Sequence, residues 1–335
     1  MIKLTKVKQK NMVLKNIIIN TLMKPSILVG GQAVIEGVMM RVPGAYATAV
    51  RDAEGKIHVD KHDFTSMVEN SKIWKKPVLR GIISLFESLK MGMKTLQWSA
   101  EIATPEEDKK KEPGKLAQFF TTSTAILIAL ALFMVAPYWI TTKLFLVNKE
   151  AFLFNLIAGA FRITFFVLYL ILISFMKDVK RLFQYHGAEH RVVYNFESGK
   201  AVTIKNAQSF PTQHPRCGTS FLFIVMISAI IVFSIIDTIF IGFFGNLTVI
   251  SRIILHLLMM PFVAGIGYEV LKKSARKSDN AFFKMFRAPG LWLQNITTKE
   301  PEDAMVEVAI ESLKSAFGDK YKDITGKKYV AEAIG

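Results

Sequence analysis

Two histidines and a glutamate lie within five positions of the stretch YHGAEHR, where His186 is followed by Glu189 and His190. Residues four positions apart share one face of an α-helix, so the two imidazoles can bind one metal ion. Glu189 stands beside the second histidine, where its carboxylate can act as a general base toward water. This spacing is the H-x-x-E-H reversal of the H-E-x-x-H metalloprotease motif, and it predicts a zinc site that hydrolyses a peptide, amide or ester bond.

A zinc site of this kind needs at least one further protein ligand, and His214 and Cys217 in the stretch HPRCG are the nearest. Three protein ligands with an open position would make a catalytic site, in which Glu189 is the catalytic residue. A closed set of His186, His190, His214 and Cys217 would be structural. A metal-free pair of helix histidines in a packed core is the third interpretation. The catalytic interpretation is favoured, and the alternative is a non-catalytic membrane scaffold or assembly factor with a structural zinc site.

Cys217 is the one cysteine of the chain, which excludes an internal disulfide and fits a reducing compartment. It also admits an enzyme without metal, in which the thiol is a nucleophile beside His214. Arg216, the preceding residue, would then lower the pKa of the thiol.

Further residues are expected beside the ligands or against substrate, namely Gln32, Glu36, Arg41, Arg216 and Glu269. The first three belong to the glycine-rich stretch GGQAVIEGVMMR, residues 30–41, which lacks the Gly-Lys-Ser/Thr of a phosphate-binding loop. Its glycines would let backbone approach the metal pocket or would form a turn. Arg41 would pair with Glu36, bind an anionic substrate or face solvent.

Four apolar segments are long enough to span a bilayer, which takes about 20 residues. They are residues 119–141, 151–176, 219–241 and 249–271. With 51% hydrophobic residues, the composition also argues against an ordinary soluble domain. The chain is therefore expected to be a mainly α-helical membrane protein with about four transmembrane helices.

The basic residues predict the orientation in the membrane. Of 43 lysines and arginines, 39 lie in the terminal regions and in the loop 177–218, and only 2 lie in the loop 142–150. Positively charged loops stay in the cytoplasm, so both termini and the loop 177–218 are expected there. The net charge of +16 is accordingly assigned to the membrane and not to nucleic acid.

Outside the spans, the patterns predict a cytoplasmic α+β N-terminal region and a cytoplasmic C-terminal helix. Two strands are expected at 46–51 and 56–61, and amphipathic helices at 78–101 and 300–318. The expected division of the chain is a basic extension (1–25), a hairpin and amphipathic-helix region (26–103), a charged linker (104–118), a four-span domain with the metal-site loop 177–218 (119–271) and a C-terminal region (272–335).

The second span is expected to continue as a helical stalk that carries the histidines. Apolar residues and histidines recur there at spacings of three and four, at Phe175, Val179, Phe183, His186 and His190. Within the spans, Arg162 and Asp237 are expected to form an ion pair, because an isolated charge in a bilayer is costly.

Five stretches in order along the chain resemble the YqhQ family of bacterial membrane proteins. They are GGQAVIEGVMMR, YHGAEHR, HPRCGTSF, GIGYEV and PGLWLQNITTKEPEDAMVEVAI, which together cover about Ser26 to Leu313. The family is catalogued as a domain of unknown function and described as predicted metal-dependent enzymes. The resemblance implies a multi-pass protein of the bacterial cytoplasmic membrane, and it supplies no demonstrated reaction. Arg191 departs from the lysine expected after the second histidine. The expected partners are the lipid bilayer and a peptide or lipid-linked substrate.

Overall fold

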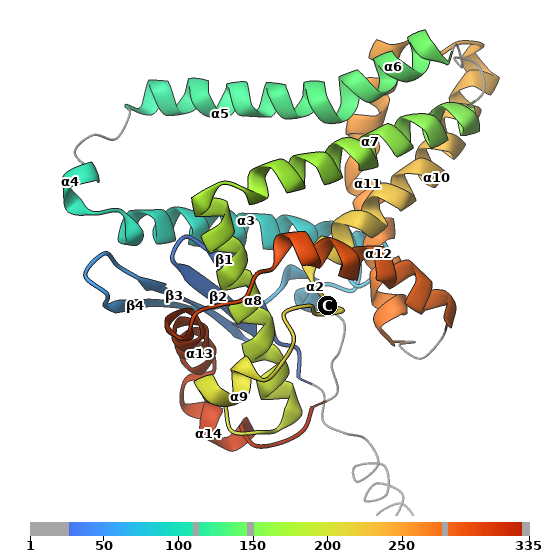
Figure 1. Ribbon diagram of the computed structural model, residues 1–335. Helices are drawn as coiled ribbons and strands as arrows, with labels where there is room; N and C mark the ends of the chain where they lie inside the picture. The colour runs from blue at the N-terminus through green and yellow to red at the C-terminus, as the bar shows by residue number, and fades with distance from the viewer. Residues whose placement is uncertain (1–26, 110–113, 146–150, 277–280, 330–335) are drawn as a thin grey trace, which may run out of the picture.

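The computed structural model describes residues 27–109, 114–145, 151–276 and 281–329 (Figure 1). These residues are mainly helical, with a small antiparallel sheet near the N-terminus. The basic extension predicted for residues 1–25 lies outside the described residues.

The sheet is a meander in the order β1-β2-β3-β4, with each strand antiparallel to the next. Its strands are β1 (Gly30–Val34), β2 (Gly37–Val42), β3 (Ala45–Arg51) and β4 (Ile57–Asp63). The strands predicted at 46–51 and 56–61 are confirmed as β3 and β4. The glycine-rich stretch 30–41 forms the first hairpin, with Glu36 at a φ of 49° in its turn.

The two faces of the sheet pack against different helices, because alternate residues of a strand face opposite sides. On one face, buried residues of β2 and β3 pack against α8 (Lys177–Ser198) and α13 (Asp303–Phe317) in the main hydrophobic core. On the other face, Met39 and Tyr46 pack against Met91 of α3 (Leu79–Ala103). The predicted helices at 78–101 and 300–318 are confirmed as α3 and α13.

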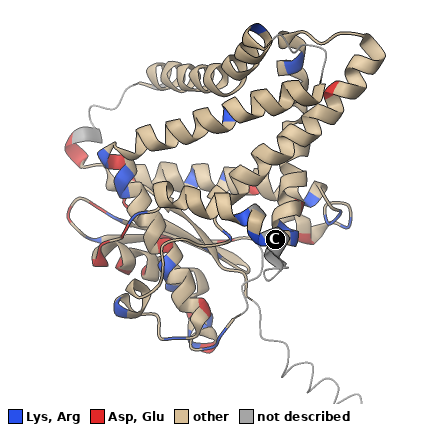
Figure 2. Ribbon diagram, turned by 45° about the vertical axis from the view of Figure 1, so that its right-hand side comes forward, with Lys and Arg blue, Asp and Glu red and all other residues tan. Residues whose placement is uncertain are grey.

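Four helices are long and apolar enough to cross a membrane. The first comprises α5 (Lys115–Leu130), η1 (Ala131–Val135) and α6 (Ala136–Leu144), and the others are α7 (Ala151–Ser174), α10 (Gly218–Phe244) and α11 (Val249–Arg276). Charged residues are sparse along these helices and gather around the sheet and at helix ends (Figure 2). The four segments predicted as spans therefore form helices of the expected length.

The remaining helices connect these elements. They are α2 (Met67–Asn70), α4 (Glu106–Lys109), α9 (Ile204–Gln208), α12 (Ala281–Thr297), η2 (Gly318–Lys320) and α14 (Tyr321–Ile324). Of these, α12 packs against α10 and brings its C-terminal end beside α8 (Figure 1).

The second span does not continue as a stalk, so that prediction is wrong. The helix α7 ends at Ser174, and Met176 adopts an extended backbone with a ψ of 133° before α8 begins at Lys177. The amides of Phe175 and Met176 bond to carbonyls only three positions back, which tightens the last turn of α7. The break turns α8 out of the direction of α7 and lays it against the sheet (Figure 1).

The predicted ion pair between Arg162 and Asp237 is also wrong. Asp237 contacts two residues of the following helix instead, with 3.2 Å to Arg252 Nε and 2.8 Å to His256 Nε2. Arg162 donates to the hydroxyl of Tyr138 at 3.0 Å. Arg252 and His256 lie one turn apart on α11, which packs along α10, so the geometry of that helix pair decides the partners of Asp237.

Candidate metal centre

The helix α8 carries His186, Glu189 and His190 into the interior of the molecule. It packs against the sheet and α13 along one side, while the segment after α12 crosses it at Gly187. A side chain at Gly187 would overlap the carbonyl oxygen of Lys299, so the glycine allows this close crossing. The crossing brings the backbone carbonyl of Thr297 to His186.

Both histidines of α8 are held by backbone carbonyls. His186 donates from Nδ1 to the Thr297 oxygen at 2.8 Å, and His190 donates from Nδ1 to the Thr212 oxygen at 2.5 Å. A carbonyl can only accept, so in the neutral rings the lone pair remains on Nε2. Metal-binding histidines have this arrangement, because the outer hydrogen bond sets the tautomer and orients the ring.

Cys217 completes a cluster of three potential ligand atoms. It is the N-cap residue of α10, and its Sγ lies 3.2 Å from Nε2 of His186. The ligand atoms of His186, His190 and Cys217 all lie within 4.8 Å of one another. Ligand atoms of a tetrahedral zinc ion lie about 3.4 to 3.8 Å apart, so the three residues are close enough to hold one ion.

The charges in this cluster favour the ligand form of the cysteine. Burial raises the pKa of the Cys217 thiol, but the neighbouring His186 and His190 outweigh it and bring the pKa well below its usual range. Burial lowers the pKa of His186, whereas the Cys217 thiolate raises it, to a net value of about 9. Without a metal the two form a thiolate–imidazolium pair, and a cation can replace that proton.

The carboxylate of Glu189 faces the same space. The residue is buried, and its Oε2 lies 3.4 Å from Nε2 of His190. A Cβ at Gly31 of β1 would lie 2.7 Å from the Glu189 Cγ, so the glycine makes room for this side chain. The charge of Glu189 also acts on Arg216 and His214, which line the same cavity.

His214 lies beside the cluster but outside it. Its Nδ1 accepts a hydrogen bond from the Arg216 amide at 3.3 Å, so in the neutral ring the proton is on Nε2. That Nε2 is buried and has no hydrogen-bond partner among the described residues; its nearest anion is Glu197, at 3.8 Å. Burial, together with the charge of His190, lowers the pKa of His214 to about 4. His214 is therefore a neutral donor in this structure, and its ring lies outside the cluster of three potential ligand atoms.

A small cavity joins these groups. Its volume is about 50 Å³, and its walls include Gly31, Glu189, His214, Arg216 and the three clustered residues. A water molecule takes about 30 Å³ in the liquid, so the enclosed space is large enough for an ion with solvent.

Comparison with known proteins places the chain in a family. Residues 76–319 match the model of a family described as "Protein of unknown function (DUF1385)". The chain belongs to this family. It is also 34% identical over 298 residues to the "Uncharacterized protein YqhQ" of Bacillus subtilis (strain 168), across 84% of this chain and 90% of that protein. No solved structure matches the chain. The predicted resemblance to the YqhQ family is confirmed.

The matched range holds all three clustered residues, Glu189 and His214, whereas the sheet precedes it. Two of the residues expected beside the ligands also fall within it. Arg216 lines the cavity and forms a buried ion pair with Glu197. Glu269 lies elsewhere, two turns before the C-terminal end of α11, where it pairs with Arg80 of α3 at 2.5 Å.

The three expected residues of the first hairpin lie outside the cavity of the metal cluster. Glu36 forms a two-bond pair with Arg181, at 2.6 and 2.5 Å, so of the three alternatives for Arg41 the pairing with Glu36 is not the one in the structure. Gln32 faces Gly92 of α3, and Arg41 lies on that same α3 face of the sheet. Neighbouring residues of a strand face opposite sides of the sheet. Gly31 therefore faces Glu189, whereas Gln32 faces α3.

Sequence reasoning missed Glu197 and the two carbonyls that hold the histidines. Glu197 is seven residues after His190 and so lies on the same side of α8, a spacing that could have revealed it. The carbonyls of Thr212 and Thr297 carry no signal in the sequence, because every residue has one. Cys217 lies against His186 and not against His214, which leaves no support for the cysteine–histidine pair considered from the sequence.

Proposed function

We propose that this protein is a zinc-dependent membrane hydrolase whose catalytic centre lies on the cytoplasmic side of the bacterial inner membrane. One observation carries the proposal. Two imidazole nitrogens and one sulfur lie within 4.8 Å of one another, and they share a buried cavity with the carboxylate of Glu189. Three protein ligands beside a buried carboxylate are typical of catalytic zinc sites, whereas structural sites have four.

The orientation rests on the charge distribution along the chain. The loop 177–218 supplies every candidate ligand, and it carries 7 lysines and arginines, against 2 in the loop 142–150. Such an asymmetry between short loops favours the cytoplasm for the richer side. The site would therefore act on substrates that reach it from the cytoplasm or from the inner leaflet.

The ligands in this proposal are His186, His190 and Cys217. A zinc ion held by them would supply Lewis acidity and lower the pKa of bound water to about 7. Glu189 accepts a proton from water as the water oxygen bonds to the carbonyl carbon, the bond to the leaving group then breaks, and Glu189 gives the proton to that group. The Nε2–H of His214, which has no partner of its own, donates a hydrogen bond to the carbonyl oxygen of the substrate. The scissile bond is an ester or amide, in a peptide or a lipid-linked molecule.

A structural zinc site in a membrane scaffold or assembly factor is the second candidate. The cavity of about 50 Å³ favours it, because a space of this size holds an ion with solvent but not a whole organic substrate. A cation held by Cys217 and the histidines of α8 would then link the start of α10 to α8, which packs against the sheet.

The two candidates differ in what they require of Glu189. We expect purified protein in lipid nanodiscs to contain one zinc ion by elemental analysis, and the His186→Ala, His190→Ala variant to contain none. Glu189→Gln should keep the zinc but lose about 10²- to 10⁴-fold in hydrolysis of a panel of acyl esters and fluorogenic peptides. Glu36→Gln, which changes a carboxylate away from the cavity, is the matched control.

Equal zinc content in the wild type and the double-alanine variant would remove the metal centre. A wild type that holds zinc and hydrolyses no member of the panel, or a Glu189→Gln variant of unchanged activity, would count against the hydrolase. Either of the last two results, with zinc present, would favour the structural site.

A further inference from the structure

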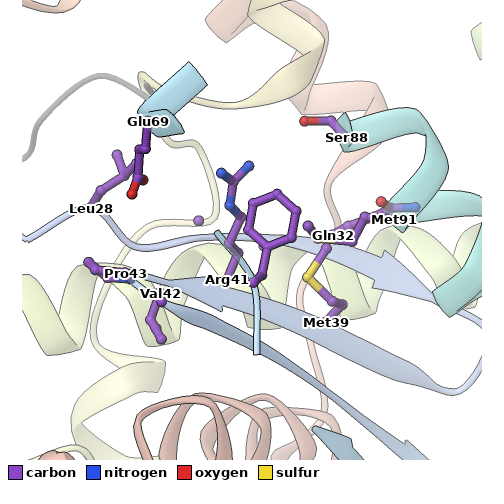
Figure 3. A pocket seen from close by; sticks show the side chains of 13 residues that line it. Leu28, Gln32, Met39, Arg41, Val42, Pro43, Glu69, Ser88 and Met91 are labelled. Atoms are coloured by element: carbon purple, nitrogen blue, oxygen red, sulfur yellow. The ribbon is translucent and has the colours of Figure 1, made fainter. Parts of the chain in front are cut away.

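A second and larger cavity lies on the opposite face of the sheet, between the first two strands and α3 (Figure 3). Its volume is about 310 Å³, within the range of small-molecule sites. The walls are mostly apolar and include Leu28, Met39, Val42, Phe64 and Met91. Gly30 and Gly31 line this cavity and the one at the metal cluster, so the backbone of the edge strand β1 separates the two.

Arg41 extends into the middle of this apolar space (Figure 3). Its guanidinium carbon lies 4.5 Å from the centre of the Phe64 ring. Among the described residues, Arg41 forms no ion pair and donates no hydrogen bond. Burial lowers its pKa, partly offset by Glu87 and Glu69, yet an arginine keeps its charge in proteins. A partly buried cation with free donors favours an anionic ligand.

The nearby carboxylates do not satisfy this arginine. Glu87 accepts hydrogen bonds from Ser66 Oγ at 2.7 Å and from the amide of Met67 at 2.6 Å, so it is occupied at the start of α2. Glu69 lies at the rim of the cavity, exposed to solvent and without an ion pair to Arg41. The interior of the cavity therefore keeps its positive charge.

The helix α3, which covers the cavity, is fixed to the candidate span α11. Arg80 of α3 forms a two-bond pair with Glu269 of α11, at 2.7 and 2.5 Å, and Gly81 packs against Tyr268. An exposed apolar stripe runs along α3, formed by Phe86, Leu89, Met93 and Leu96. A helix with such a stripe, held against a span, is expected to lie in the membrane surface. The cavity beneath such a helix would then lie next to the bilayer.

We propose that this cavity binds an acidic amphiphile from the membrane. Its acidic head group would pair with the guanidinium of Arg41, and the first part of its alkyl chain would contact Met39, Phe64 and Met91. The apolar walls, the unpaired arginine and the position under α3 each support one part of this ligand. Binding requires no metal and does not rest on the proposed hydrolase.

Isothermal titration calorimetry with the protein in phosphatidylcholine nanodiscs tests the proposal. Octyl phosphate is the probe, and octanoate shows whether a carboxylate serves as well as a phosphate. We expect one octyl phosphate per chain, and binding at least about tenfold weaker for the head alone (glycerol phosphate) and for an uncharged chain (octyl glucoside). Arg41→Gln should weaken octyl phosphate at least about tenfold, because charge-assisted hydrogen bonds are lost.

Three variants serve as controls. Arg41→Lys should restore part of the affinity, and Glu69→Gln should increase it, since a repelling carboxylate at the rim is removed. Lys90→Gln, at an exposed lysine of α3, should change it by less than about twofold. Equal binding of octyl glucoside, or an Arg41→Gln variant that binds as the wild type does, would overturn the proposal.

The zinc content of the same preparations separates this proposal from the previous one. Protein that holds zinc and does not bind octyl phosphate would overturn the amphiphile site alone. Protein without zinc that binds octyl phosphate would overturn the metal centre alone. The His186→Ala, His190→Ala variant should bind octyl phosphate as the wild type does.

Discussion

At the scale of single residues, the candidate metal centre depends on one proton. The Nδ1 atoms of His186 and His190 are bound to carbonyls, so the two Nε2 atoms and the Cys217 sulfur meet with a single proton to share. The thiolate–imidazolium pair is stable there because its opposite charges lie 3.2 Å apart, which outweighs the cost of burial. A divalent cation can replace this proton without further change of charge on the sulfur.

The lowered pKa of Cys217 predicts the pH dependence of the metal-free protein. A depressed pKa means that the thiolate is present at neutral pH and is lost only in acid. In the denatured chain the thiolate should form around pH 8.5, the usual value for cysteine. Ultraviolet absorbance of the thiolate against pH, with Cys217→Ser as the blank, measures both. A folded protein that titrates near pH 8.5 would contradict the ion pair.

At the scale of elements, the site is made where three segments cross. The helix α8 brings the two histidines, the start of α10 brings Cys217, and the C-terminal end of α12 brings the Thr297 carbonyl. The close crossing at Gly187 holds the last of these in place. Hydrogen bonds of this outer kind orient metal ligands, and their loss costs about 10- to 100-fold in metal affinity.

Gly187→Ala tests this crossing. The added methyl group would overlap the carbonyl oxygen of Lys299, so the segment must move away and take the Thr297 carbonyl with it. We expect zinc affinity, measured by competition with a chromogenic chelator, to fall at least about tenfold. Gly242→Ala is the control, since a side chain there meets open space. Unchanged affinity in Gly187→Ala would show that the carbonyl is dispensable.

At the scale of the whole molecule, the candidate metal centre joins two parts with different environments. One part is the sheet with α8 and α13, and the other is the set of helices long enough to cross a membrane. Because Cys217 is the N-cap of α10, the centre lies at the end of a candidate span. The amphiphile cavity lies beneath α3, which is tied to another candidate span, α11.

Four crossings of the membrane, as we propose, would leave the sheet, α8 and both ends of the chain on one side. The proposed orientation places them in the cytoplasm, because the basic residues gather there. Fusions of green fluorescent protein and alkaline phosphatase after residue 335 should give fluorescence and no phosphatase activity. The same reporters inserted in the loop 242–248 should give the reverse. Phosphatase activity at the C-terminus would invert the orientation.

The sequence alone determined the features that depend on neighbours along the chain. Apolar length marked the four long helices, and spacings of three and four marked α3, α13 and the shared face of His186 and His190. Alternation marked β3 and β4. These patterns are reliable because side-chain direction repeats every 3.6 residues in a helix and every two in a strand.

Only the tertiary structure decided which distant groups meet. It placed Cys217 and not His214 among the clustered ligand atoms. It also paired Glu36 with Arg181, and it placed Asp237 in contact with Arg252 and His256. It also turned the expected stalk into a helix laid on the sheet. The Glu36–Arg181 pair, for example, joins residues 145 positions apart, and such contacts follow from packing between elements that no local pattern encodes.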